Sequence, residues 1–177
     1  MLPRAKQLIE KFDLSQHPEG GWYKRIYQSS DTVIAPQRFK SNDQRRSAFT
    51  IIYFLILNDD FSAFHKIKSD ETFIFLEGNP ITIHILNPTS QEYQTIQLGP
   101  SSNENCIPTA IIPHDTWFAA EAQEEQDYAL INCYVAPGFE FYDFELANRS
   151  ALITQFPEHS QIITRLTRST TITDETF

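Results

Sequence analysis

The chain has 177 residues, a length that fits one domain with a sizeable core, and a formal net charge of −9. This excess of acidic groups opposes the phosphates of nucleic acids and anionic lipid surfaces, so neither is an expected partner. No apolar run approaches the ~20 residues of a membrane span, and the start of the chain lacks the apolar region of a signal peptide. A cytoplasmic protein is therefore expected.

The first predicted element is a short amphipathic helix, because apolar residues recur at helical spacing within 2–13. The sequence HPEGG at 17–21 breaks this pattern and predicts a turn. Nine short apolar or alternating runs follow, separated by turn signals, and they predict β-strands. These runs are 21–29, 46–57, 61–67, 71–76, 81–86, 93–98, 109–113, 116–122 and 128–137. No helical pattern intervenes between them, which excludes parallel βαβ units and favours a sandwich or barrel.

The pattern changes after the ninth strand. The aromatic-rich segment GFEFYDFELA at 138–147 is predicted to cap the barrel or to form a dimer interface. Helical turns are expected at about 145–168. The whole chain, 1–177, is interpreted as a single domain with its core at about 17–147.

Residue types associated with common catalytic motifs are sparse. The two cysteines, Cys106 and Cys133, lie in apolar segments and are expected to be buried free thiols. The sequence has no G-x-S-x-G elbow, Gly-rich phosphate loop, H-E-x-x-H pair or C-x-x-C pair. Nucleophilic hydrolases and nucleotide-hydrolysing enzymes therefore have little support.

An imidazole and a carboxylate interrupt the apolar alternation of the stretch 64–80. Alternation places His65 on one face of its strand and Glu71 on one face of the next. If these strands form a hairpin, the two side chains lie close together on the inner face. The cavity around them would then be walled by Phe61, Phe73 and Phe75. Such a pair is suited to metal binding or to acid–base chemistry.

The order and spacing of several motifs resemble the cupin superfamily. His65, a three-residue turn, Glu71 and then Gly78 are similar to the first cupin motif, and 113–118 resembles the second. The sequences HPEGG at 17–21, SDE at 69–71, P-x-x-x-W at 113–117 and APGF at 136–139 resemble small single-domain cupins of undefined activity. The resemblance spans roughly 12–147. It implies an all-β fold, a double-stranded β-helix or jelly-roll barrel with short helices at both ends and a ligand pocket inside.

The ligand set of a typical cupin metal is incomplete in this chain. The resemblance implies three histidines and a glutamate, of which only His65 and Glu71 are kept. Ile67 and Phe118 stand where further histidines are expected, although His84 on a neighbouring strand is a candidate replacement. Two protein ligands rarely fill a coordination shell. No cofactor is identified, and a divalent metal is less expected than a metal-free pocket.

The competing use of His65 is as a general base oriented by Glu71. Sugar-nucleotide 3,5-epimerases of the superfamily resemble this arrangement and pair a histidine base with a tyrosine acid. Tyr134 is the acid chosen here, with Tyr53 and Tyr23 as alternatives. The side chains expected to contact a substrate are Phe73, Phe75, His84, Phe118 and Lys24, with Arg25 as a second cation for an anionic group.

Three functional hypotheses follow from these residues. The first is a protein that binds a small polar, carbohydrate-like molecule without established activity. The second is a metal-independent sugar epimerase or isomerase, and the third is a metal enzyme with a reduced ligand set. A homodimer is expected, because edge strands and the apolar APGF region need covering and cupins commonly pair.

Overall fold

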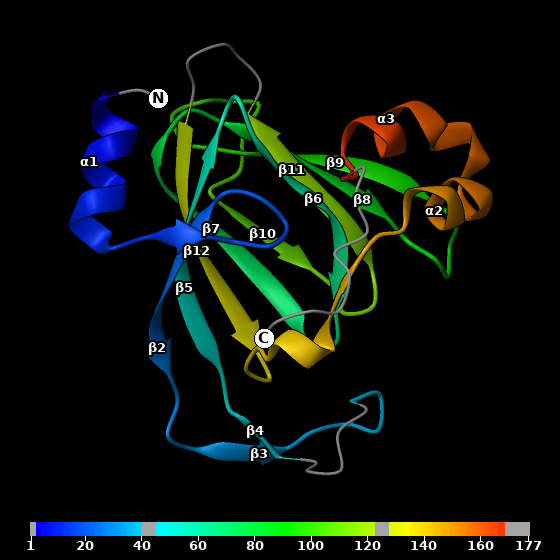
Figure 1. Cartoon of the computed structure of the whole chain (residues 1–177), viewed down its shortest axis with the longest axis horizontal. Coiled ribbons are helices and arrows are strands. Elements are labelled where there is room, and N and C mark those ends of the chain that lie inside the picture. Colours follow the sequence, from blue (N-terminus) through cyan, green and yellow to red (C-terminus); the bar gives the residue numbers. More distant parts are fainter. Residues whose placement is uncertain (1–2, 40–44, 123–127, 169–177) are drawn as a thin grey trace.

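The computed structural model describes residues 3–39, 45–122 and 128–168, and its main feature is a barrel of two facing antiparallel sheets (Figure 1). The six-stranded sheet has the order β1 (Ser15–Gln16), β2 (Trp22–Gln28), β5 (Thr50–Leu57), β12 (Tyr128–Ala136), β7 (Asp70–Gly78), β10 (Thr109–Ile112). The five-stranded sheet has the order β13 (Phe144–Leu146), β6 (Phe61–Ile67), β11 (Trp117–Ala122), β8 (Ile81–Leu86), β9 (Tyr93–Leu98). A separate ribbon pairs β3 (Thr32–Ile34) with β4 (Arg45–Ser47). The jelly-roll expectation is confirmed.

Each of the nine predicted runs contains a strand, and the N-terminal helix is present as α1 (Pro3–Phe12). The sequence did not reveal the short strands β1, β3 and β13, which pair only over two or three residues. Runs this short carry too few residues to show an alternation.

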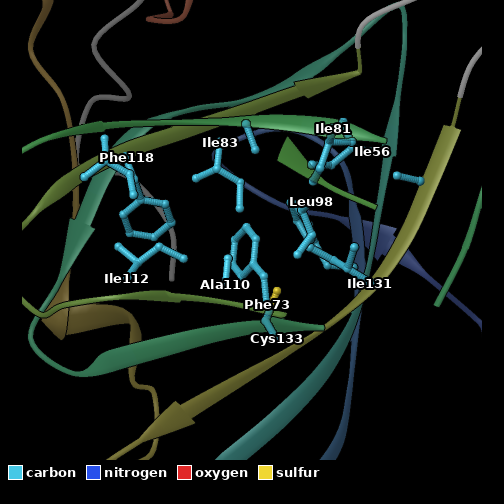
Figure 2. Packing of buried hydrophobic residues seen from close by; sticks show 14 residues of the cluster. Ile56, Phe73, Ile81, Ile83, Leu98, Ala110, Ile112, Phe118, Ile131 and Cys133 are labelled. Atoms are coloured by element: carbon cyan, nitrogen blue, oxygen red, sulfur yellow. The ribbon is translucent and has the colours of Figure 1, made fainter. Parts of the chain in front are cut away.

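The main core lies between the two sheets (Figure 2). Alternation along β8 directs Ile81, Ile83 and Ile85 inward, where they are buried against residues of the facing sheet such as Phe73 and Ile131. Burying an isoleucine or phenylalanine of this size contributes roughly 1.5–3 kcal/mol to folding. The residues that alternate with these isoleucines therefore face outward, and His84 is one of them.

Helices cover the outer face of each sheet. The apolar side of α1 packs on the six-stranded sheet, with Leu8 buried against Leu55 and Leu130. The helices α2 (Arg149–Gln155) and α3 (Ser160–Arg165), with the 3₁₀ turn η2 (Pro157–His159) between them, pack on the five-stranded sheet around Phe64. Among the described residues, no helix has the length and apolarity needed to cross a membrane.

The strands β6 and β7 follow each other in the chain but belong to different sheets. The hairpin considered for His65 and Glu71 is therefore not formed: β6 pairs with β11 and β13, and β7 pairs with β12 and β10. The two side chains line one pocket from opposite sheets instead.

The aromatic segment that follows β12 is anchored by a buried ion pair. Asp143 belongs to the 3₁₀ turn η1 (Phe141–Asp143), and its Oδ2 lies 2.9 Å from Nε of Arg46 on β4. The Arg46 guanidinium also lies over the rings of Phe39 and Tyr142. This pair joins the β3–β4 ribbon to η1 and so fixes the segment that closes one side of the site.

Candidate functional site

A pocket lies inside the barrel beside η1 and receives side chains from both sheets. It has about 530 Å³ of empty space, counting the part open to solvent. Its polar lining consists of His17, Glu19, Tyr23, Arg25, Thr50, His65, Glu71 and Cys133. Its apolar lining consists of Ile52, Phe54, Ile67, Val135, Phe139, Phe141 and Phe144.

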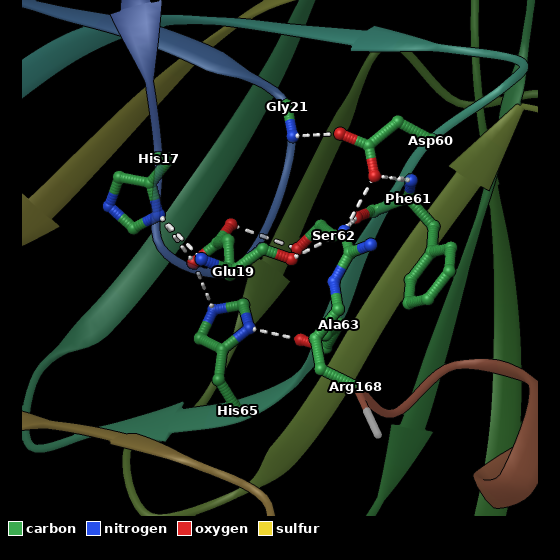
Figure 3. A network of polar contacts seen from close by, with 9 residues as sticks. All are labelled: His17, Glu19, Gly21, Asp60, Phe61, Ser62, Ala63, His65 and Arg168. Carbon is green, nitrogen blue, oxygen red and sulfur yellow. Dashed lines mark hydrogen bonds and ion pairs between the residues drawn. The ribbon is translucent and has the colours of Figure 1, made fainter. Parts of the chain in front are cut away.

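The side chain of Glu19 is the centre of a buried polar network (Figure 3). Its Oε2 atom lies 3.2 Å from Nδ1 of His17 and 3.3 Å from Nε2 of His65. Its Oε1 atom accepts a hydrogen bond of 2.9 Å from the hydroxyl of Ser62. Burial by itself would raise the pKa of Glu19, but the two imidazoles and the hydroxyl outweigh it and lower the pKa to about 2. Glu19 is therefore a buried carboxylate.

The loop that presents Glu19 depends on two glycines. Gly20 and Gly21 have φ angles of +107° and +71°, which residues with a side chain rarely adopt. A Cβ atom on Gly20 would lie 2.1 Å from the carbonyl oxygen of Phe61, so there is no space for one. The turn is closed by the Gly20 N–H, which donates to the carbonyl of His17 at 2.9 Å. HPEGG is thus the sequence of a tight loop that directs His17 and Glu19 into the barrel.

The imidazole of His17 is enclosed by aromatic rings. Tyr23 and Phe144 meet it edge-on at centroid distances of 4.7 and 5.8 Å. Phe141 stacks on it at 5.7 Å, and Phe54 lies edge-on at 6.0 Å. These rings fix the orientation of His17 and leave the Glu19 carboxylate as its charged neighbour.

The tautomer of His65 follows from its contacts. Nδ1 lies 2.7 Å from the carbonyl oxygen of Ala63, which can only accept, so Nδ1 carries a hydrogen. The contact between Nε2 and the Glu19 carboxylate is therefore attractive only when Nε2 is protonated as well. Burial lowers the pKa of His65, while Glu19 and the Ala63 carbonyl oppose this. The ring of Phe118 packs against the imidazole, with 4.0 Å between the two ring centroids. The net shift of the His65 pKa is downward, so the neutral imidazole with its hydrogen on Nδ1 is favoured.

Glu71 lines the same pocket, and its protonation state is opposite to that of Glu19. Burial, together with the negative charge of Glu19, raises the pKa of Glu71 to about 8, while a hydrogen bond from Cys133 partly offsets the rise. Burial also raises the pKa of the Cys133 thiol. Glu71 is consequently protonated at neutral pH. Two carboxyl groups with pKa values pushed far apart therefore face one pocket.

Of the residues predicted to act in catalysis or metal binding, His65 and Glu71 line the pocket and Tyr134 does not. Tyr134 alternates with Cys133 on β12, and because Cys133 faces inward, Tyr134 faces outward and stacks on Phe49 at 4.8 Å. Among the alternative tyrosines, Tyr23 lines the pocket.

Of the predicted substrate contacts, Arg25 lines the pocket, and the other five lie outside its lining. His84 is on the outer face of the five-stranded sheet, 3.0 Å from Glu121 and 2.8 Å from the hydroxyl of Tyr93. Lys24 faces outward from β2 and forms an ion pair of 2.6 Å with Asp13. The phenylalanines of this prediction, Phe73, Phe75 and Phe118, belong to the core cluster rather than to the lining.

His17 and Glu19 are the site residues that the sequence interpretation missed. Both lie in HPEGG, which was interpreted as a turn and as part of the cupin resemblance. A signal was present, because a histidine and a carboxylate two residues apart precede two glycines that require a special backbone. Their contact with His65 depends on long-range folding that no local pattern reveals.

The donor set does not fit a cupin-type metal. Among residues 3–39, 45–122 and 128–168, no group of three or more His, Cys, Asp or Glu side chains could hold a metal ion. Both imidazoles face one oxygen of Glu19, whose other oxygen is taken by Ser62. Phe118 fills the space beside His65 where the resemblance expects a histidine.

Two antiparallel sheets form a jelly roll around a polar pocket, an architecture that includes the cupins. The fold is similar to that of a cupin 2 domain-containing protein from Halorhodospira halophila, with a TM-score of 0.51, 11% identity, and coverage of 89% of this chain and 97% of that chain. At this identity the likeness supports the fold alone.

The chain belongs to the family described as "Cupin superfamily (DUF985)", whose model matches residues 6–147. It is similar to a solved protein from Shewanella oneidensis, with 32% identity, a TM-score of 0.80, and coverage of 93% of this chain and 97% of that chain. It is also similar to a hypothetical protein from Leishmania major, with 27% identity, a TM-score of 0.83, and coverage of 93% and 99%. No curated protein matches the chain by sequence. The resemblance to cupins of undefined activity is confirmed.

Proposed function

We propose that the protein binds a small polar, carbohydrate-like molecule in the barrel pocket. The observation that carries this proposal is the convergence of an ionised Glu19, His65 and a protonated Glu71 on one open cavity. Buried polar groups of this kind fix the orientation of a polar ligand, while aromatic walls cover its apolar faces. Phe139, Phe141 and Phe144 supply such walls.

The activity that these groups support best is a metal-independent proton transfer, as in an epimerase or isomerase. In this reaction His65 takes a proton from the carbon next to a carbonyl group, and the electron pair moves onto the carbonyl oxygen to form an enolate. Glu71 then returns a proton to that carbon, which leaves His65 protonated and Glu71 ionised until water restores both. The lowered pKa of His65, which favours its neutral form, and the raised pKa of Glu71, which keeps a proton to donate, support this division of roles.

A ligand screen tests the proposal. Free sugars, sugar phosphates and nucleotide-sugars are added to the protein, and binding is measured by thermal shift and calorimetry. His65→Asn is expected to weaken binding of the best ligand by about tenfold through loss of one polar contact. The control His114→Asn alters an exposed histidine in a turn and is expected to bind normally. A ligand that binds both variants equally well would contradict the assignment of the pocket.

Proton transfer is tested separately by incubating the bound ligand in D₂O. Deuterium is expected to enter at the carbon next to the carbonyl group in the presence of the protein, and not with Glu71→Gln or His65→Asn. Binding without any exchange would leave the binding function and exclude the isomerase.

Arg25 predicts an anionic group on the ligand. It is the one guanidinium or ammonium group among the described lining residues, and its Nη1 donates to Gln28 at 3.0 Å. Arg25→Met is expected to weaken an anionic ligand by about tenfold and a neutral analogue hardly at all, because guanidinium contacts with carboxylate or phosphate are charge-assisted. Lys24→Met is the matched control, since Lys24 faces outward from the same strand. An equal loss for charged and neutral ligands would contradict this role.

The homodimer stays a prediction. Ile74 and Ile111, which lie on the outer face of the six-stranded sheet with 38% and 64% of their surface exposed, support it as candidates for a covered surface.

A further inference from the structure

The C-terminal end of the described chain returns to the loop that carries Glu19. After α3 the carbonyl of Leu166 accepts a hydrogen bond of 2.8 Å from the backbone N–H of Phe64. Two residues later, Nη2 of Arg168 lies 2.6 Å from Oδ1 of Asp60, 2.7 Å from the carbonyl oxygen of Phe61 and 3.1 Å from the carbonyl oxygen of Glu19. One guanidinium nitrogen thus joins the β5–β6 turn, the start of β6 and the Glu19 loop (Figure 3).

We propose that Arg168 is a positioning residue for the candidate site: it holds the HPEGG loop so that the Glu19 carboxylate meets His65 and His17. The inference deepens the proposed function and rests on it for its catalytic meaning. Arg168 does not line the pocket, so its effect on the site is through the loop that carries Glu19.

Asp60 connects Arg168 to the loop a second time. Its Oδ2 atom accepts the backbone N–H of Gly21 at 2.8 Å, while Oδ1 accepts Arg168 and the N–H of Phe61. The carboxylate is therefore shared between the two segments, so losing the guanidinium leaves one side of Asp60 without its cation. Charge-assisted hydrogen bonds of this kind are stronger than neutral ones and fix geometry more closely.

The HPEGG loop packs closely against the guanidinium of Arg168. A Cβ atom on Gly20 would lie 2.0 Å from Nη2 of Arg168, so the space of a side chain is occupied by Arg168. The Cζ atom of Arg168 also lies 4.0 Å from the centroid of the Phe61 ring, which gives it a cation–π contact. The carbonyl of Glu19 has a further donor in the N–H of Ala63 at 2.9 Å. The backbone of Glu19 is thus held from two sides, by β6 and by the C-terminal segment.

The competing explanation is that Arg168 only docks the C-terminal helices. The chain offers a matched residue for that role, because Arg165 on α3 forms an ion pair with Glu121 on β11, away from the pocket. Replacing either arginine removes one ion pair from the same segment. Arg165 and Arg168 both form ion pairs in the described part of this segment. Of these two residues, only Arg168 contacts the loop that carries Glu19.

The test is a comparison of full-length Arg168→Met, Arg165→Met and Glu19→Gln by thermal unfolding and by the imidazole ¹⁵N signals of His65 at one fixed pH. Glu19→Gln defines the signal of His65 without its carboxylate. The reference quantity is the difference in His65 chemical shift between the wild type and Glu19→Gln. Arg168→Met is expected to produce at least roughly half of this difference, because His65 and Glu19 act as one coupled unit. Arg165→Met is expected to leave them in place while lowering the melting temperature.

Arg168→Lys provides the graded case and a second variant should Arg168→Met fail to fold. Its ammonium keeps the charge but not the planar fork, so it is expected to give an intermediate His65 signal. Unchanged His65 signals in the Arg168 variants, with a lower melting temperature, would show a docking role only and overturn the proposal. Because the signals are recorded without ligand, a failure of ligand binding would count against the proposed function and leave this result intact.

Discussion

Glu19→Gln is expected to lower the free energy of unfolding near neutral pH by about 3 kcal/mol. Removing one partner of a buried charged network costs roughly 3–5 kcal/mol, because the remaining polar groups stay buried without their counter-charge. The pKa gives a similar figure: a fall from 4.5 to about 2 corresponds to roughly 3 kcal/mol at about 1.4 kcal/mol for each pH unit.

The pH dependence of the Glu19→Gln effect has a definite sign. The pKa of Glu19 is lowered in the folded state, so its contribution is fully present above pH 4.5 and is lost as the pH falls toward 2. Denaturant unfolding of the wild type and the variant across this range is expected to show two curves that converge in acid. A difference that stays constant with pH would mean that the carboxylate charge is not what stabilises the network.

Glu71→Gln is expected to stabilise the protein in alkali. The folded pKa of about 8 lies above the ordinary 4.5, so the contribution of Glu71 to stability is fully present below pH 4.5 and is lost as the pH rises from there through 8. Glutamine imitates the protonated acid without titrating. The variant is therefore expected to exceed the wild type above pH 8 by up to roughly 4–5 kcal/mol.

Unfolding midpoints measured between acid and alkaline pH check the Glu71 prediction. Glu145→Gln is the matched control, because Glu145 is largely exposed beside Lys66 and such surface changes usually stay within about 0.5 kcal/mol. If Glu71→Gln were less stable than the wild type in alkali, Glu71 would have to be ionised and paired in the folded protein. The role of Glu71 as a proton donor would then fail as well.

The two buried carboxyl groups depend on each other. The charge of Glu19 contributes to the raised pKa of Glu71, so the Glu19→Gln variant is expected to have a Glu71 that titrates closer to its ordinary range. The network therefore sets both the stability curve and the protonation states that the proposed proton transfer requires.

The fold was accessible from the sequence to a large extent. Nine strands were predicted from alternation and turn signals, and each is present, because period-two patterning and turn chemistry act locally. The partner of each strand was not accessible. The consecutive strands bearing His65 and Glu71 invited a hairpin, whereas the jelly roll places them in opposite sheets.

The candidate site divides in the same way. His65 and Glu71 were found because polar residues interrupt an apolar strand, and that interruption can be seen in one segment. Tyr134 was expected at the pocket but lies on the opposite face of β12, because the inward face of this strand is decided by its position between two neighbours in the sheet. Lys24 and Arg25 are adjacent in the chain, and only the packing of α1 on one face shows which of them faces the pocket.

By itself the sequence determined an all-β fold, because strand periodicity and turns are properties of short segments, and its motifs carried the resemblance to cupins that implied a pocket with His65 and Glu71. Only the tertiary structure decided that Glu19 from HPEGG lies against His65, and that Arg168 reaches the same loop. The first contact joins residues that are 46 positions apart in the chain, and the second joins residues that are 149 positions apart. Their proximity is produced by the packing of two sheets and a returning C-terminal segment, which no local pattern encodes.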